Sequence, residues 1–329
     1  MTVRVRVTSP ASLSNLGPGF DILGLALADP ADTVEAEASD RPGVEIVDVT
    51  GDEGLLSRDP RQNVAGVAAA DVLARAARTS GVAPAATGLR LWLTKGIPIA
   101  SGLGGSAASS VAGAVAANEV LGRPFAPLEL VESALAGEAV AAISAHGDNV
   151  LPCLLGGIVL VRSLAPLDVV SLPVPPGLHL AVVHPHCQVP TSEARALLKD
   201  LRWNLSDAVA NAANVGSFVS ALHTGDLQLL GRSVADRLVE PVRARLIPGF
   251  DRVKAAAQAS GALACSISGS GPTVFAFACD ERSARRAAAA MEQAFADAAG
   301  LASDVYVGQV NTQGTRSIRH VRSGTRAGL

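Results

Sequence analysis

Residues 96–113 read Gly-Ile-Pro-Ile-Ala-Ser-Gly-Leu-Gly-Gly-Ser-Ala-Ala-Ser-Ser-Val-Ala-Gly, and this stretch decides the fold. The preceding residues 89–95 alternate leucine with other side chains, which predicts a strand, and the small residues 106–121 predict a helix. A glycine-rich turn that opens a helix presents unpaired backbone N–H groups and the positive end of the helix dipole. The stretch therefore predicts an anion site at the start of a helix, and phosphate is the usual anion.

Taken alone, this motif leaves two other interpretations open. Residues 102–107 fit the G-x-G-x-x-A dinucleotide fingerprint, but a proline-bounded helix follows where that fold places a strand ending in an acidic residue. A tight strand-to-helix turn that serves only packing is the second alternative. A Walker A loop is excluded because the sequence contains no Gly-Lys-Ser/Thr.

The composition is typical of a globular protein. With 329 residues, of which 49% are hydrophobic and 17% charged, the chain is long enough for two domains. A formal net charge of −3 and 3% aromatic residues argue against binding to nucleic acid or to an anionic membrane surface. The four cysteines are scattered, which indicates reduced thiols, and the N-terminus alternates like a strand, unlike a signal peptide. No apolar run reaches the ~18 residues of a membrane span, so we expect a cytoplasmic protein without membrane or nucleic-acid partners.

The order of the predicted elements indicates two domains. A proline-rich stretch, residues 165–177, has no helical period and is interpreted as the boundary. After it, the pattern predicts strand, helices, strand, strand, helix and strand up to residue 310, which is the split βαβ order of a ferredoxin-like sandwich. The expected units are an N-terminal domain, a C-terminal domain and a disordered basic tail: 1–165, 166–312 and 313–329.

Further polar residues suggest what the anion site does. Two more glycine loops, 16–21 and 268–272, suggest backbone that approaches a polyanion or a small substrate, although each alone is also explained as a surface turn. Phosphoryl transfer needs a divalent cation with oxygen ligands. Ser106 stands at the start of the predicted helix, and Glu138 lies in an otherwise apolar helix, where a solvated position is the alternative.

A second polar group follows that glutamate. His146, Asp148 and Asn149 are expected in a loop, residues 144–149, between apolar stretches. Arginine is the side chain best suited to hold a carboxylate in bidentate fashion, and two arginines are candidates for that role: Arg195 and Arg243. A zinc interpretation is also open for a short cluster that has no fourth ligand nearby: His184, His186 and Cys187.

Three stretches together resemble a known family, the GHMP small-molecule kinases. Residues 10–21 (Pro-Ala-Ser-Leu-Ser-Asn-Leu-Gly-Pro-Gly-Phe-Asp), 98–108 (Pro-Ile-Ala-Ser-Gly-Leu-Gly-Gly-Ser-Ala-Ala) and 267–273 (Ile-Ser-Gly-Ser-Gly-Pro-Thr) resemble its three signature motifs, in order. The resemblance extends to about residue 312. The first and third motifs are similar to those of the members that phosphorylate L-homoserine, and so are three other stretches: 146–157, 191–195 and 240–250.

This resemblance implies both a fold and an activity. The fold is α+β with two domains, an N-terminal domain like the second domain of ribosomal protein S5 and a ferredoxin-like C-terminal domain, usually in a homodimer. The activity is transfer of the ATP γ-phosphoryl group, with Mg²⁺, to the side-chain hydroxyl of L-homoserine, a step of threonine biosynthesis. The resemblance leaves open other GHMP substrates, namely mevalonate, its phosphate and shikimate, and a non-catalytic binding protein.

The family's site residues are carried over position by position. The residues implied to line the amino-acid site are Asn15, Asp21, His146, Asp148, Thr191, Arg195 and Arg243. The residues implied to act at the reacting groups are Glu138, Ser106 and Asn149, of which Ser106 and Glu138 hold the metal. The residues implied to bind ATP are Pro98, Ile99, Ala100, Ser101, Gly102, Leu103, Gly104, Gly105, Ser106, Ala107 and Ala108, together with Asn63.

The sequence departs from the family pattern at two places. Gly105 stands where relatives usually have the first of two serines, but Ser106, the implied metal ligand, is present. The residues before His146 read Ile-Ser-Ala, where relatives often have a Ser-Gly pair. Some family members use a lysine–aspartate pair as general base, but no lysine is placed for that role by the motifs, so we expect no strong base.

Overall fold

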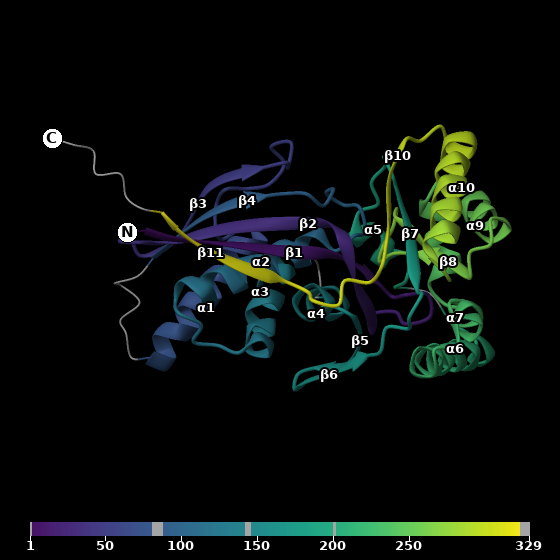
Figure 1. Ribbon diagram of the computed structural model, residues 1–329, viewed down its shortest axis with the longest axis horizontal. Coiled ribbons are helices and arrows are strands. Elements are labelled where there is room, and N and C mark those ends of the chain that lie inside the picture. The colour runs from purple at the N-terminus through teal and green to yellow at the C-terminus, as the bar shows by residue number, and fades with distance from the viewer. Residues whose placement is uncertain (1, 81–87, 142–145, 200–201, 323–329) are drawn as a thin grey trace.

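The structure, a computed structural model, describes residues 2–80, 88–141, 146–199 and 202–322 and has two sheets that helices cover. The larger sheet lies in the left half of Figure 1 with helices below it, and the smaller sheet stands in the right half with helices of its own. The predicted α+β class with two units is confirmed.

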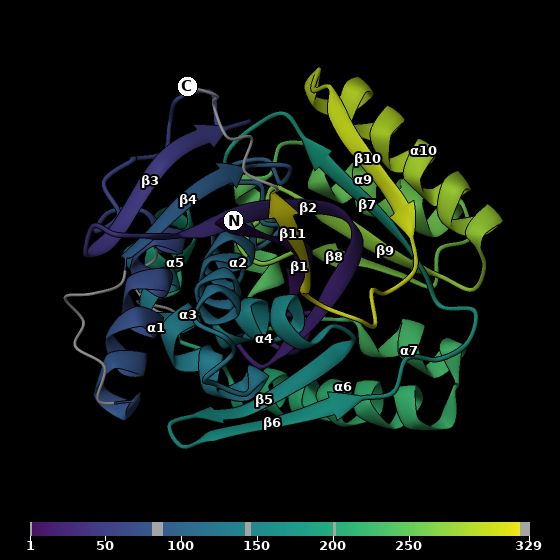
Figure 2. The same ribbon diagram turned by 60° about the vertical axis from the view of Figure 1, so that its left-hand side comes forward.

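Seven strands form the larger sheet: β1 (Thr2–Ser14), β2 (Leu23–Ser39), β3 (Gly43–Thr50), β4 (Gly88–Thr94), β5 (Ile158–Leu164), β6 (Leu167–Leu172) and β11 (Arg316–Arg322). Five of them run in the order β11-β1-β2-β4-β3, and β5 pairs with the start of β2 and carries β6 beside it. Side chains alternate between the two faces of each strand, so residues paired across neighbouring strands share a face. Val5, Ala36 and Leu91 are paired in this way and are at most 1% exposed, which marks the buried face of the sheet. Figure 2 shows the β5–β6 hairpin running beneath the four helices of this unit.

Those helices pack on one face of the larger sheet: α1 (Val64–Ser80), α2 (Gly105–Val120), the 3₁₀ turn η2 (Pro127–Leu130), α3 (Val131–Ala141) and α4 (Gly147–Leu155). Small residues allow α2 to lie in the middle of this layer with most of its surface buried. A Cβ on Gly113 would lie 2.4 Å from the Ala65 carbonyl oxygen, so the close contact with α1 requires glycine. The helix predicted at 106–121 is confirmed as α2.

The smaller sheet has four antiparallel strands: β7 (His179–Pro185), β8 (Ala264–Ile267), β9 (Val274–Ala278) and β10 (Ser303–Gly308). Their order in the sheet, β10-β7-β9-β8, is the order of a ferredoxin-like sandwich, as predicted. Its helices are α5 (Thr191–Ala196), α6 (Leu205–Thr224), α7 (Leu227–Ser233), α8 (Glu240–Arg243), the 3₁₀ turn η3 (Ala244–Leu246), α9 (Phe250–Ala259) and α10 (Glu281–Ala299).

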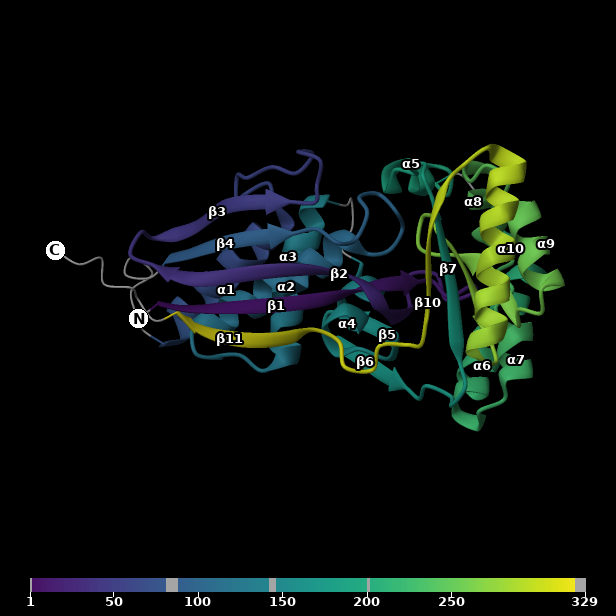
Figure 3. The same cartoon turned by 45° about the horizontal axis from the view of Figure 1, so that its top comes forward.

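Strand β9 connects the two units, because one of its faces packs in the core of the C-terminal unit and the other packs in a core that the two units share. Ala276 packs with Met291 and Phe295 of α10, whereas Phe275 and Phe277 face the other way. The two phenylalanines belong to a hydrophobic cluster that continues into β1 and β2 of the larger sheet. Figure 3 shows the smaller sheet and its helices standing at one end of the larger sheet. This shared core fixes the end of β1, and with it the first glycine loop, against the C-terminal unit.

Three features differ from the expectations. The prediction of a disordered tail from residue 313 is wrong for residues 316–322, because β11 pairs along β1 and covers its edge. The larger sheet extends to Leu172, beyond the expected boundary at 165, because β6 pairs with β5. The polar residues expected in a loop instead begin helix α4, with His146 as its N-cap. Among the described residues, no helix is long and apolar enough to span a membrane.

The tail strand is held by one nearly buried carboxylate, and this contact can be tested. Glu119 of α2, 7% exposed, accepts hydrogen bonds from Ser317 and Arg319 of β11 and from Arg123. Substitution Glu119→Ala removes these bonds, so we expect the free energy of unfolding in urea to fall by about 2 kcal/mol. The exposed pair of Glu45 with Arg90 is the control, and Glu45→Ala is expected to change stability by at most ~0.5 kcal/mol. Equal effects of the two substitutions would contradict this account.

Candidate active site

A cleft of about 620 Å³ lies where the two units meet. The sequence-predicted residues that line it are Asn15, Asp21, Asn63, Pro98, Ile99, Ala100, Ser101, Gly102, Gly104, Gly105, Ser106, Glu138, His146, Asp148, Asn149, Arg195 and Arg243. Leu103, Ala107 and Ala108 are fully buried behind the lining. Thr191 begins α5, but its side chain lies outside the described part of the chain. The structure thus brings nearly all of the predicted residues together.

The phosphate loop, defined here as residues 96–104, turns the chain from β4 into α2. Gly104 caps the helix in the left-handed conformation with φ of 65°. A Cβ there would lie 2.0 Å from the Ser12 hydroxyl and 2.8 Å from Oδ1 of Asn149, so only glycine fits. The Ser12 hydroxyl donates to Asn149 Oδ1 at 2.8 Å, which orients that amide at the cleft wall. The backbone at the start of α2 therefore faces the cleft, as an anion site requires.

The third glycine motif packs directly against the phosphate loop. A Cβ on Gly102 would lie 2.7 Å from the Gly271 carbonyl oxygen and 2.8 Å from that of Ser268. The Ser268 hydroxyl donates to the Gly102 carbonyl at 2.7 Å, and the Thr273 N–H donates to the Ser101 carbonyl at 3.2 Å. The glycines of these two loops therefore serve contact between loops as well as contact with a ligand.

Ser106 and Glu138 meet at the cleft, on neighbouring helices. The Ser106 hydroxyl donates to Oε1 of Glu138 at 3.0 Å, while Oε2 is buried without a hydrogen-bond partner. Burial raises the pKa of this carboxyl to about 7, although the Ser106 hydrogen bond and the charge of Lys95 oppose the rise. A hydroxyl and a buried carboxylate oxygen lacking a partner form a hard oxygen donor set, which fits Mg²⁺.

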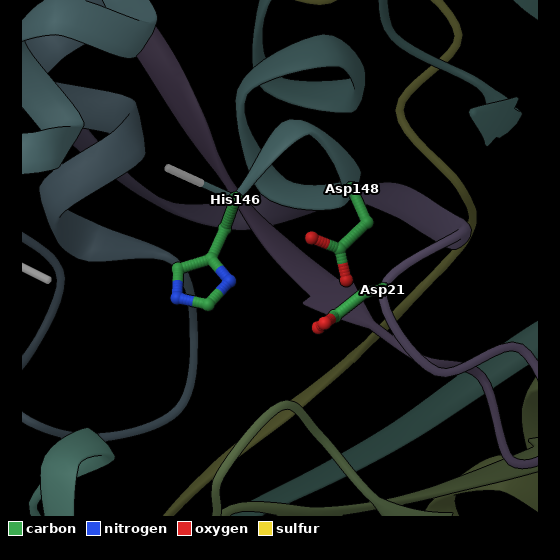
Figure 4. A group of neighbouring side chains, drawn as sticks. All are labelled: Asp21, His146 and Asp148. Atoms are coloured by element: carbon green, nitrogen blue, oxygen red, sulfur yellow. The ribbon is translucent and has the colours of Figure 1, made fainter. Parts of the chain in front are cut away.

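Acidic groups gather at the other end of the cleft. Figure 4 shows Asp21 and Asp148 with their carboxylates close together and His146 beside them. Asp148 is 1% exposed and its Oδ1 has no hydrogen-bond partner. Burial and the neighbouring Asp21 charge raise the pKa of Asp148 to about 7. Burial and the charge of Arg195 lower the pKa of His146, so that imidazole is neutral at pH 7. These groups favour a cationic ligand.

Two arginines face this acidic group. Arg195 pairs with Asp21 at 3.0 Å and lies 3.1 Å from Nδ1 of His146. Arg243 is buried and donates to the Gly269 carbonyl at 2.7 Å. Both guanidinium groups lie over the Phe20 ring, with Cζ 5.6 Å (Arg195) and 5.0 Å (Arg243) from its centroid. Burial and the charge of Arg195 lower the pKa of Arg243 to about 10, so the Arg243 guanidinium stays cationic at neutral pH.

Two expectations from the sequence, a nucleotide contact for Asn63 and a zinc site, have no contact in the structure that supports them. Asn63 lines the cleft, but its side chain accepts from the Ala65 N–H and donates to the Ser57 carbonyl at the start of α1. Its contact with a nucleotide stays a prediction. The zinc interpretation has no support: His184 hydrogen-bonds Thr273, and His186 pairs with Asp304. Among the described residues, the group of acidic and imidazole ligands close enough for a metal is Asp21, His146 and Asp148.

A lysine that the sequence did not single out lies in the cleft. Lys95 lines it and pairs with Asp32, and both side chains are at most 4% exposed. The expectation that no lysine serves as general base stays a prediction. Phe20 and Ser12 were also missed, although both lie inside the first motif. The signal available in the sequence for Lys95 was its position at the end of the strand that leads into the phosphate loop.

The raised pKa of Glu138 predicts a pH-dependent stability. A carboxyl whose pKa rises from near 4.5 to about 7 on folding costs stability above pH 7 and nothing below pH 4.5. We therefore expect Glu138→Gln to increase the free energy of unfolding in urea at pH 8 by up to about 3 kcal/mol relative to wild type. At pH 4.5 this increase is expected to be absent. Glu292 is exposed, so Glu292→Gln is the control. It is expected to leave the free energy of unfolding unchanged at both pH values. A Glu138→Gln protein that loses stability equally at both pH values would contradict the burial argument.

Comparison with protein-family models matches two parts of the chain. Residues 64–157 match the GHMP kinases N terminal domain, and residues 218–297 match the GHMP kinases C terminal model. The N-terminal match spans α1, the phosphate loop, Glu138 and all of α4. The C-terminal match spans the third glycine motif and most of α10.

Curated relatives cover nearly the whole chain. A homoserine kinase of Chlorobium phaeobacteroides strain BS1 is 42% identical over 94% of this chain and 97% of its own. A homoserine kinase of Pyrococcus furiosus is 40% identical over 93% of this chain and 98% of its own. The crystal structure of a homoserine kinase from Cytophaga hutchinsonii has a TM-score of 0.89 and 46% identity, covering 96% of this chain and 97% of that one. Leishmania major mevalonate kinase, 16% identical with a TM-score of 0.70, shares the fold.

Proposed function

Because the chain belongs to the GHMP kinase family, we propose that it transfers the γ-phosphoryl group of ATP to the side-chain hydroxyl of L-homoserine. Full-length similarity to homoserine kinases from distant lineages supports this substrate over the other members of the family. One observation carries the proposal: a single cleft holds an anion site at a helix start and, beside it, paired opposite charges suited to an amino-acid zwitterion.

The zwitterion has matching partners in this cleft. Arg195 and Asp21 form an ion pair across 3.0 Å. An amino acid brings a carboxylate and an ammonium group, so it can replace each partner by one of its own charges. Arg195 and Arg243 then hold the carboxylate, and Asp21 with Asp148 faces the ammonium group. Mevalonate and shikimate have a carboxylate but no ammonium group, so they bring no cation of their own to Asp21 and Asp148.

The phosphates of ATP bind at the start of α2. The N–H groups of its first turn and the helix dipole stabilise the negative charge. Ser106 and Glu138 are the residues that would hold Mg²⁺, which neutralises charge on the phosphates when bound. Asn149, held by Ser12, lies between the two ends of the cleft and orients the reacting hydroxyl.

No residue of the described chain is assigned as a strong general base. Some members of the family use a lysine–aspartate pair as general base, and Lys95 with Asp32 is such a pair in this cleft. The Lys95 ammonium group, however, donates all of its hydrogens to Asp32, Gly105 and Ser109. An ammonium group in that state has no site to accept a proton. Catalysis therefore rests on positioning and electrostatic stabilisation, which suffice for a loose phosphoryl-transfer transition state.

The first test is the choice of substrate. ADP release is measured with L-homoserine, mevalonate and shikimate, each at saturating ATP and Mg²⁺. We expect turnover with homoserine alone. Turnover with mevalonate or shikimate but not with homoserine would overturn the proposal, and absence of turnover with all three would favour a non-catalytic binding protein.

The resemblance also supports a homodimer, which sedimentation equilibrium of the purified chain tests.

The second test addresses the carboxylate-binding arginine. Arg243→Met keeps the length of the side chain but removes the guanidinium group, so KM for homoserine is expected to rise at least ten-fold while KM for ATP changes less than two-fold. Arg245, exposed and two residues further on, is the matched control. Arg245→Met is expected to leave both KM values unchanged. An equal rise of both KM values for Arg243→Met would mean that this residue does not bind the amino acid.

A further inference from the structure

A buried carboxylate lies behind the phosphate loop. Asp32 of β2 is 1% exposed. Its Oδ1 accepts from the Gly96 and Ile97 N–H groups, both at 3.0 Å, where the loop begins. Its Oδ2 accepts from the Ser109 hydroxyl at 2.7 Å and from the Lys95 ammonium group. Both oxygens of a buried anion are thus satisfied, and two of the four donors are backbone groups of the loop.

Lys95 connects this carboxylate to the other end of the loop. Besides Asp32, its Nζ donates to the Ser109 hydroxyl at 2.9 Å and to the Gly105 carbonyl at 3.0 Å. Gly105 is the first residue of α2, directly before Ser106. The same side-chain pair therefore binds the backbone where the phosphate loop begins and where it ends.

We propose that Lys95 and Asp32 are positioning residues that clamp the two ends of the phosphate loop and so orient its N–H groups toward the nucleotide phosphates. This inference rests on the proposed function, because it assigns the anion of this loop to ATP. Donors that are held before the ligand arrives need no rearrangement when charge appears, which is the condition for strong electrostatic stabilisation. The pair carries no net charge, so its contribution comes from geometry.

Gly105 lies beside the clamp. A Cβ on Gly105 would lie 3.1 Å from Cγ2 of Ile97 and at ordinary contact distance, 3.4 Å, from the Lys95 Nζ.

A purely structural role is the alternative, and the variants must separate the two. Removal of one partner of a buried ion pair is destabilising in itself, because the other charge stays buried and unpaired. Removal of both charges avoids that penalty. Asp32→Asn and Lys95→Met are therefore made singly and together. Lys254→Met is the control, since Lys254 pairs with Glu240 in the C-terminal unit, although that pair is less buried.

The measurements are the affinities for ADP and for adenosine, by calorimetry with Mg²⁺ present, and the midpoint of thermal unfolding. The clamp predicts at least a ten-fold loss of ADP affinity in both single variants and in the double variant, with adenosine affinity changed less than two-fold. The double variant is expected to recover thermal stability relative to Asp32→Asn without recovering ADP affinity. In steady-state assays, KM for ATP rises and KM for homoserine changes less than two-fold.

Three results would overturn the clamp. They are a double variant with wild-type affinity for ADP, an equal loss of affinity for adenosine and ADP, and a similar loss of ADP affinity in Lys254→Met. Failure of the wild-type protein to bind ADP at all would instead overturn the proposed function, so the two ideas fail in distinguishable ways.

Discussion

Close packing against the glycines of the phosphate loop is the constraint on which the rest of the structure depends. Gly102 lies against the carbonyl groups of Ser268 and Gly271 from the C-terminal unit, and Gly104 lies against Ser12 and Asn149 from the N-terminal unit. Each contact leaves no room for a Cβ. The loop therefore takes one position only when both units are in place, and the hydrophobic cluster shared through β9 holds them there. The start of α2, which a phosphate needs, is fixed by the whole fold.

Polar atoms without hydrogen-bond partners are the second property of the cleft. Oε2 of Glu138, Oδ1 of Asp148 and the Nε atoms of both arginines are buried without such partners. A buried polar atom without a hydrogen bond costs stability, because it loses its hydration. Under the proposed function, a metal, a nucleotide and an amino acid would supply the missing partners. Burial raises the pKa of both carboxyls to about 7.

The sequence predicted much of this because its strongest signals are local. Helix α2 follows from the glycine turn and the small residues after it, and the ferredoxin-like order follows from the pattern of elements. The ion pair of Lys95 with Asp32 was missed because 63 residues separate its partners and only the pairing of β2 with β4 brings them together. Strand β11 was missed because its charged sequence looks solvated, and it is ordered only by β1 and Glu119. The residues expected in a loop at 146–149 instead lead into helix α4, which begins at Gly147 with His146 in the N-cap position and without a side-chain capping hydrogen bond.

The central claim is that phosphate moves from ATP to the side-chain hydroxyl of an amino acid in this cleft. Phosphorus NMR of the purified protein with ATP, Mg²⁺ and L-homoserine tests it most directly. The account predicts a new phosphomonoester signal, coupled to the methylene protons next to the former hydroxyl, that grows in step with ADP. Inorganic phosphate as the sole new phosphorus signal beside ADP, or a phosphorylated product without that coupling, would contradict it.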